Sequence, residues 1–337
     1  MKTNLDKHIQ TDMNKEQELP ASIRQAFDKS YDQIRQQAKK KPRKSWLKPV
    51  SAAVAVLALS TTILVTNDTA LAKLQAFFGL NDPGIENALE QGDVHSVPQV
   101  QVSEGVAITL EHLFVDAYRF GLQVDIQSEH IHDDLYYLDF EFRLYDAQGQ
   151  EISAHVSDTK PIAGPGVFSG GKYVLGDVAN NRATLEFLTE AHTTSIPSLE
   201  GAKFVIETVH FLNSEGGQTS IDGNWSFDVM PTTILTETFV AKNTVPGLEL
   251  LEASLSNGSM KVTYKTDNVI DNENDFFETA LVTANGEAFY ANSASPHYLE
   301  EENQTIVNLV FPYSIWSEEK TLSLKVKGYE ALELVQK

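Results

Sequence analysis

An apolar run near the N-terminus of this chain has no equivalent elsewhere in the sequence. It covers residues 50–66, VSAAVAVLALSTTILVT, which are seventeen residues without a charge, a proline or a glycine. A helix that rises about 1.5 Å per residue would be roughly 26 Å long here, close to the thickness of the hydrocarbon core of a membrane. We therefore predict one transmembrane helix over residues 49–66.

The charges on either side of this run predict its orientation. Residues 35–48 hold seven basic side chains and no acidic one, whereas residues 67–80 hold only Asp68 and Lys73. Because basic flanks stay on the cytoplasmic side, we expect a single-pass protein of the cell membrane with a cytoplasmic N-terminus and extracellular C-terminal domains. Two alternatives are a buried core helix and a secretory signal peptide.

A signal peptide would use the small residues that follow the apolar run. Ala70 and Ala72 form an Ala-x-Ala pattern that signal peptidases recognise. The 48 residues ahead of residue 49 are long for a leader and carry a patterned helix of their own, which favours an uncleaved anchor. We keep Ala70 and Ala72 as a candidate site of proteolytic cleavage.

Charge and cysteine content exclude several classes of protein. Residues 1–48 hold 12 basic and 6 acidic residues, and the remaining residues hold 14 basic and 41 acidic ones, for a net charge of -21. An acidic chain of this kind is not expected to bind nucleic acid directly. The absence of cysteine excludes disulfides, thiolate zinc sites and cysteine nucleophiles.

Within residues 1–48, one segment has the apolar spacing of an amphipathic helix. It begins near Pro20, and its apolar side chains recur at spacings of four, four and three. They would form one stripe with no cytoplasmic core to cover it, so we expect them to bind a partner. Binding to membrane lipid at the inner leaflet is the alternative. The stripe consists of Ile23, Phe27, Tyr31 and Ile34.

Beyond residue 97 the hydrophobic period changes to two, which is typical of strands. The predicted strands cover residues 106–113, 118–126, 135–144, 204–212, 248–253, 260–265, 277–283, 305–311 and 322–329.

Parts of these strands recur in the same order, which indicates an internal repeat. DFEFRLYDAQGQEI at residues 139–152 parallels FFETALVTANGEAF at residues 276–289, with Gly149 and Gly286 in hairpin turns. We predict a mostly β protein with two tandem immunoglobulin-like β-sandwich domains, and one large β domain is the alternative. The expected organisation is a cytoplasmic helix and basic stop (1–48), the transmembrane helix (49–66), a juxtamembrane linker (67–96), sandwich domain 1 (97–230) and sandwich domain 2 (231–337).

This arrangement resembles a Gram-positive family of single-pass membrane proteins related to anti-sigma factors. The resemblance is carried by LPASIRQAFDKSYDQIRQQAKKKPRKSW, by the crossing and by the strands VAITLEHLFVDAYRFGLQVDI. It implies an ectodomain known only as a domain of unknown function and a cytoplasmic sigma factor as the partner. The His-x-x-x-Cys-x-x-Cys zinc motif of many anti-sigma domains is missing from the sequence.

Motifs that would carry catalysis or metal binding are weak. Residues 166–173, GVFSGGKY, have the frame of a phosphate loop, but they end on Tyr173 and open a strand, which favours a plain glycine-rich loop. His130 and His132, with Asp133 or Asp134, could hold zinc, and residues 267–275 could hold calcium, but a solvated loop is the simpler interpretation of both. We predict no enzyme, no metal and no cofactor.

These observations predict a membrane-anchored signalling regulator similar to an anti-sigma factor. Its ectodomain would sense a condition of the cell envelope through an unknown ligand, and its cytoplasmic helix would hold the partner. The alternative is a structural or adhesive cell-surface protein with immunoglobulin-like domains.

Overall fold

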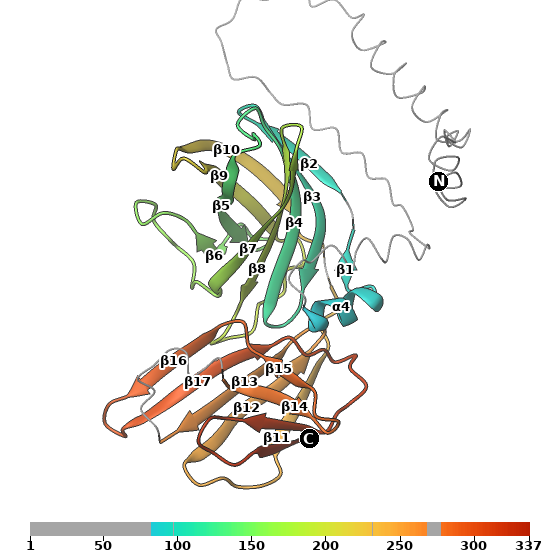
Figure 1. The fold of residues 1–337 in the computed structure, drawn as a ribbon, viewed down its shortest axis with the longest axis vertical. Helices are drawn as coiled ribbons and strands as arrows, with labels where there is room; N and C mark the ends of the chain where they lie inside the picture. Colours follow the sequence, from blue (N-terminus) through green and yellow to red (C-terminus); the bar gives the residue numbers. More distant parts are fainter. Residues whose placement is uncertain (1–81, 97, 231, 268–277) are drawn as a thin grey trace, which may run out of the picture. The chain divides into compact units, whose positions relative to one another are not determined.

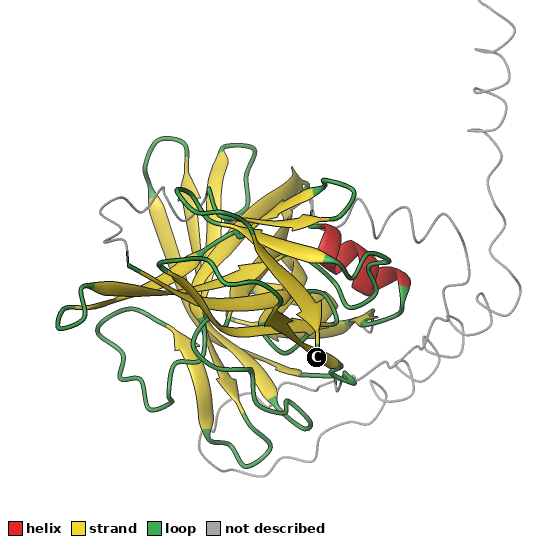
Figure 2. Cartoon of the chain, turned by 90° about the horizontal axis from the view of Figure 1, so that it is seen from below, coloured by secondary structure: helices red, strands yellow, loops and turns green. Residues whose placement is uncertain are grey.

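The computed structural model describes residues 82–96, 98–230, 232–267 and 278–337. Strands dominate this part of the chain, and its one helix is α4, Pro83–Glu90 (Figure 2). The prediction of a mostly β protein is therefore confirmed. The transmembrane and amphipathic helices predicted before residue 67 lie outside the described residues. Among the residues that are described, no helix has both the length and the apolar character needed to span a membrane.

Residues 82–230, here called the first β region, contain two sheets (Figure 1). In the first sheet the strand order is β1 (Val94–His95), β3 (Val106–Val115), β4 (Arg119–Gln127), β8 (Arg182–Glu190) and β7 (Ser169–Ala179), and β2 (Gln99–Ser103) also pairs with β3. In the second sheet the order is β10 (Gln218–Asp228), β9 (Lys203–Asn213), β5 (Leu135–Tyr145) and β6 (Glu151–His155).

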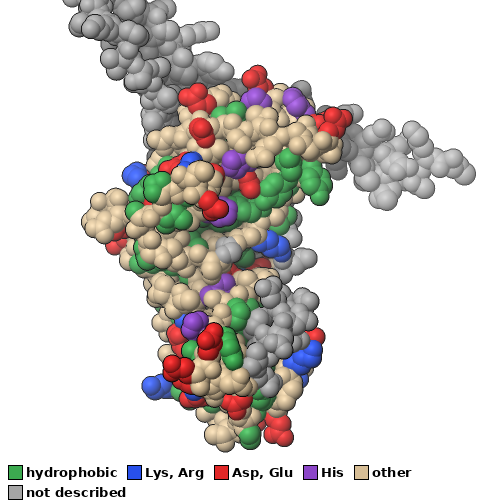
Figure 3. All heavy atoms as spheres, turned by 90° about the vertical axis from the view of Figure 1, so that its left-hand side faces the viewer, with side chains coloured by type: hydrophobic (Ala, Val, Ile, Leu, Met, Phe, Trp, Pro, Cys, Tyr) green, Lys and Arg blue, Asp and Glu red, His purple; other side chains and the backbone are tan. Residues whose placement is uncertain are grey.

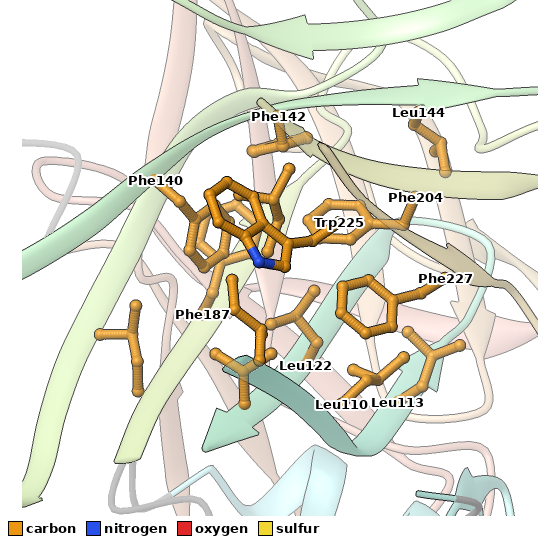
Figure 4. Packing of buried hydrophobic residues seen from close by; sticks show 14 of the residues in the cluster. Leu110, Leu113, Leu122, Phe140, Phe142, Leu144, Phe187, Phe204, Trp225 and Phe227 are labelled. Atoms are coloured by element: carbon orange, nitrogen blue, oxygen red, sulfur yellow. The ribbon is translucent and has the colours of Figure 1, made fainter. Parts of the chain in front are cut away.

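An aromatic core lies between these two sheets (Figure 4). Trp225 on β10 is fully buried there, and its indole Nε1 donates a hydrogen bond to the carbonyl of Val106 at 3.0 Å. Phe142 from one sheet meets Phe187 from the other with ring centroids 5.2 Å apart. The alternation of apolar and polar residues along the strands places these rings on the inner faces, and the result is a sandwich-like pair of sheets.

Residues 232–337, the second β region, form one sheet of nine strands. Its order is β15 (Ala288–Tyr290), β14 (Ala280–Thr283), β18 (Leu322–Lys325), β19 (Leu332–Gln336), β11 (Thr236–Ala241), β12 (Leu248–Ser256), β13 (Met260–Thr266), β17 (Gln304–Phe311) and β16 (Ala294–Leu299). The first half of β11 pairs with β12 and its second half pairs with β19, so one strand joins two parts of the sheet around a separate core.

The strand orders of the two regions match. The order β3-β4-β8-β7 in the first region corresponds to β12-β13-β17-β16 in the second, and β10-β9-β5-β6 corresponds to β19-β18-β14-β15. The repeat predicted from sequence falls on equivalent hairpins, β5–β6 and β14–β15. Gly149 and Gly286 lie in their turns with φ of 77° and 91°, conformations that favour glycine.

The structure differs from the expected linker over residues 67–96. Within it, Asp82 caps α4 by accepting a hydrogen bond from the backbone N–H of Ile85, and Pro83 follows at the first helical position. Ile85, Ala88 and Leu89 are buried against Phe114 of β3. The helix was missed because only these three side chains carry its apolar face.

Replacing Trp225 with alanine should remove the centre of the first core. We expect a loss of about 3 to 5 kcal/mol in the free energy of unfolding, because the cavity and the broken hydrogen bond both cost stability. Denaturant titration of the purified protein measures this loss. As a matched control, Tyr136→Ala at a position 72% exposed should change stability by less than about 0.5 kcal/mol, and equal effects would contradict the packing described.

Candidate functional site

A buried arginine links three segments of the described chain. Arg119, at the start of β4, has no exposed surface. Its guanidinium donates hydrogen bonds to Asp82 Oδ2 at 2.5 Å and Oδ1 at 2.8 Å, and to the carbonyl of Gly258 at 2.7 Å. Because Asp82 also caps α4, this one side chain connects α4, β4 and the β12–β13 turn of the second region.

Asp116 strengthens the same junction from the β3–β4 turn. Its Oδ1 accepts the backbone N–H groups of Tyr118 and Arg119, both at 2.8 Å. Its Oδ2 accepts the backbone N–H of Gly258 at 3.0 Å and the hydroxyl of Ser259 at 2.7 Å. Both β regions thus converge on a buried cluster of charged and polar groups.

Glu190 lies directly opposite Arg119 in the pairing of β4 with β8. Its side chain is 4% exposed. The hydroxyl of Ser293, from the second β region, donates a hydrogen bond to its Oε2. Oε1 is buried without a hydrogen bond of normal geometry among the described residues, and the side chain of Asn292 lies close enough to act on the same carboxyl group. An unpartnered buried carboxylate oxygen is costly, so this atom marks the cluster as a candidate site.

His192 bridges the two regions beside Glu190. Its Nδ1 lies 2.5 Å from the hydroxyl of Ser169, and its Nε2 lies 3.0 Å from the hydroxyl of Ser293. The same Nε2 is 3.5 Å from Oε2 of Glu190. The four side chains form a continuous polar network from β7 to the loop before β16.

A cavity of about 420 Å³ opens at this network. A β-bulge shapes it, because Gly170 and Gly171 together oppose Thr189 where β7 pairs with β8. In a regular strand, residues three apart point to opposite faces, and the extra residue lets Ser169 and Lys172 line the same cavity. The lining residues are Ser169, Gly171, Lys172, Leu188, Thr189, Glu190, Asn292 and Ser293.

Burial sets the protonation of these groups. It raises the pKa of Glu190 to about 7, although the positive charge of Arg119 and the hydrogen bonds from Ser293 and Asn292 act to lower it. Burial also raises the pKa of Asp82 against the same guanidinium, and it lowers the pKa of His192. Glu190 therefore changes charge near neutral pH, while His192 is held in its neutral form.

The contacts of Ser169, His192 and Glu190 include those of a nucleophile with its base. General-base catalysis, however, converts the imidazole to imidazolium, and burial of His192 disfavours that form. The hydroxyl of Ser293 also lies closer to Nε2 than the carboxylate does. The arrangement is better suited to holding a polar ligand than to acyl transfer.

The stripe of Ile23, Phe27, Tyr31 and Ile34, and the candidate cleavage residues Ala70 and Ala72, lie outside the described residues.

The structure describes parts of the weaker sequence motifs, which are the histidine pair, the acidic stretch and the glycine-rich segment. His130 packs beside Phe211 with ring centroids 5.8 Å apart, and the described residues contain no group of three metal-ligating side chains that could hold an ion. Most of residues 267–275 lie outside the described part, and Asp267 accepts a hydrogen bond from Gln304 at 2.6 Å. The glycine-rich segment opens strand β7 at Ser169, as predicted, and supplies one wall of the cavity.

No model of a protein family and no curated protein matches the sequence. A solved structure described as the conserved domain protein from Bacillus anthracis is similar at 12% sequence identity, with a TM-score of 0.40, over 72% of this chain and 90% of that chain.

Asp82→Asn tests the buried ion pair and keeps the acceptor that caps α4. We expect a loss of about 3 kcal/mol or more in the free energy of unfolding, because Arg119 would be left buried without its counter-charge. Asp228→Asn, in the exposed pair with Lys203 at 2.8 Å, is the matched control and should cost less than about 1 kcal/mol. Similar losses in the two variants would contradict a special role for the buried pair.

Glu190 should make stability depend on pH. Its folded pKa of about 7 lies above its ordinary value of 4.5, so the folded state keeps a proton that the unfolded state releases between these values. Its contribution to stability is therefore largest at low pH and is lost as pH rises through 7.

Glu190→Gln removes this contribution. The difference in unfolding free energy, variant minus wild type, should increase by roughly 2 to 3 kcal/mol between pH 5 and pH 8. Denaturant unfolding at both pH values measures it, and comparing the two proteins cancels the other titrating groups they share. A difference that stays constant with pH would contradict the assignment.

Proposed function

We propose that this chain is a single-pass membrane signalling regulator similar to anti-sigma factors. In this proposal residues 1–48 are cytoplasmic, residues 49–66 cross the membrane, and the β regions form an extracellular sensor of the cell envelope. The stripe of Ile23, Phe27, Tyr31 and Ile34 holds a cytoplasmic partner, most simply a sigma factor, inactive. No nucleic acid is bound directly.

The charge distribution supports this topology. Basic residues precede the apolar run, and the remainder of the chain holds 14 basic against 41 acidic residues. Figure 3 shows acidic side chains spread over one face of the described part. A basic cytoplasmic flank and an acidic outer part agree with the way basic residues orient a membrane crossing.

The observation that carries the proposal is the attachment of the N-terminal part at the junction of the two β regions. Residues 1–81 continue into Asp82, whose carboxylate is ion-paired to the buried Arg119. Through Arg119, Asp82 is tied to the carbonyl of Gly258 in the second region. In the proposed topology, the chain runs from the membrane crossing to Asp82 and then into the β regions. A change in the contacts at this junction would therefore act directly on the connection to the membrane, as a sensor requires.

We propose further that both β regions are immunoglobulin-like sandwiches. In that fold one sheet has the order A-B-E-D and the other contains G-F-C, extended by C′ in variable-type domains. The orders β3-β4-β8-β7 and β10-β9-β5-β6 have this form, and the second region repeats it. The strands β2 and β11 precede the pattern.

Signal release would follow from cleavage between the membrane and the sensor. A single membrane helix transmits small movements poorly, and Ala70 and Ala72 lie between the predicted crossing and Asp82. In this mechanism, loosening of the Asp82 junction leads to cleavage of the chain before Asp82, and removal of the ectodomain frees the partner.

Affinity capture with residues 1–48 tests the partner. We expect a sigma factor to bind, and Phe27→Ala to weaken binding at least tenfold, because a buried aromatic anchor contributes about 2 kcal/mol or more. Gln25→Ala, on the polar face of the same helix, should leave binding unchanged. Capture of no sigma factor, or equal binding by both variants, would contradict the proposal.

Deletion of residues 1–37 in cells separates signalling from adhesion. A regulator should lose its response to envelope stress, whereas an adhesive surface protein should keep its binding. Protease added to intact cells should remove the β regions if the topology is right.

A further inference from the structure

We propose that the cavity beside Glu190 binds a small zwitterionic ligand of the amino-acid type. Its ammonium group would donate to Oε1 of Glu190, and its carboxylate would lie at Lys172. As the signal for an envelope sensor this ligand rests on the proposed function, but binding to the purified protein can be measured without it.

The first support is the unsatisfied oxygen of Glu190. Glu190 is 4% exposed and lines the cavity, and its Oε1 has no hydrogen bond of normal geometry among the described residues, with only the longer contact of Asn292 acting on the carboxyl group. Leaving a buried carboxylate oxygen without a partner costs free energy comparable to a lost hydrogen bond or more. A donor that enters the cavity would recover this cost.

The second support is the charge of the cluster around Glu190. The guanidinium of Arg119 is ion-paired to Asp82, and Asp116 and Glu190 add two further carboxyl groups to the same cluster, through the backbone N–H of Arg119 and through the pairing of β4 with β8. Burial lowers the pKa of His192, which contacts Ser293, so this imidazole adds no positive charge to the cluster. The ammonium of Lys261 is 2.9 Å from Glu252, which is its ion-pair partner. A further positive charge at Glu190 would therefore be stabilised, which favours an ammonium over a neutral hydroxyl group.

The third support is Lys172 on the opposite wall. The bulge at Gly170 and Gly171 places Lys172 on the cavity side of β7, and none of the ion pairs among the described side chains includes it. A Cβ atom at Gly171 would lie 2.9 Å from the ring of Phe187, so glycine is needed for the backbone of β7 to form this bulge. One acidic and one basic group facing one cavity match the two charges of a zwitterion.

The size and remaining lining fit a small molecule. About 420 Å³ lies within the range of cavities that bind metabolites. Leu188 offers an apolar surface for a short side chain, and Asn292 and Ser293 offer an amide and a hydroxyl from the second β region. A bound ligand would thus contact both regions next to the Arg119 junction.

Isothermal titration calorimetry of the purified full-length protein tests the inference with four probes, which are alanine, dialanine, ethylamine and propionate. Alanine and the larger dialanine carry both charges, whereas ethylamine and propionate each carry one. We expect alanine or dialanine to bind with a Kd of roughly 1 mM or tighter, and the two singly charged probes to bind at least tenfold more weakly. Because the ammonium needs the ionised carboxylate, alanine affinity should rise roughly eightfold from pH 6 to pH 7.5.

Variants separate the two ends of the site. Glu190→Gln and Lys172→Ala should each weaken alanine binding at least tenfold, and Glu190→Gln should also abolish the pH dependence. Lys203→Ala, an exposed lysine outside the cavity, should bind as the wild type does. Both variants should first be checked for cooperative unfolding.

Three results would overturn the inference. They are no binding of alanine or dialanine, equal binding of the singly charged probes, or binding unaffected by either variant. Destabilisation of Lys172→Ala without any ligand binding would mean that Lys172 itself neutralises Glu190. Because these measurements need no sigma factor, they can fail while the proposed function holds, and the reverse is also true.

Discussion

The buried pair of Arg119 and Asp82 is the contact on which the junction of the two β regions depends. Removing a guanidinium and a carboxylate from water costs several kcal/mol for each ion, and only close pairing and further hydrogen bonds offset that cost. Here the pair is bidentate, the guanidinium also meets the carbonyl of Gly258, and Asp82 also caps α4. Such a cluster tolerates few geometries, so it specifies how the helix, the first sheet and the β12–β13 turn meet.

The same cluster explains the unusual chemistry of its neighbour Glu190. Glu190 is buried beside Asp82, so its carboxyl group does not ionise at its ordinary pH. The charges of Arg119 and Asp82 both act on the carboxyl group of Glu190, with opposite sign. Protonation of Glu190 is therefore coupled to the ion pair of Arg119 with Asp82, the residue that caps α4. The hydrogen bond from the hydroxyl of Ser293 extends this coupling to the second β region.

Local pattern in the sequence was sufficient to predict most of the longer core strands, but few of the short strands or of those at the sheet edges. The period of two placed β3, β4, β5, β9, β13 and β17 within a few residues of their ends, since each alternates against a core. The equivalence of the two β hairpins was also visible, because Gly149 and Gly286 occupy turns that favour glycine. Helix α4 was not predicted, since three small apolar contacts and an aspartate cap leave little periodic signal.

The candidate site could not be predicted from sequence because it depends on contacts between distant segments. Ser169, Glu190, His192 and Ser293 meet only when β7, β8 and the loop before β16 are in place. One signal was present. A glutamate and a histidine flank Ala191 shortly after the apolar pair Phe187 and Leu188, at a place where buried charged groups need a partner. The bulge at Gly170 is visible in the sequence only as a glycine-rich stretch, which predicts a loop at the start of a strand but not a bulge.

The strand β11 has a consequence for association between copies of the chain. By pairing with both β12 and β19 it joins what would otherwise be two free sheet margins in the second β region. Among the described strands of that sheet, the outermost ones are then β15, which has three residues, and β16, which carries Pro296. A very short margin and one interrupted by proline are poor templates for strand addition, so this sheet is protected against aggregation through its backbone.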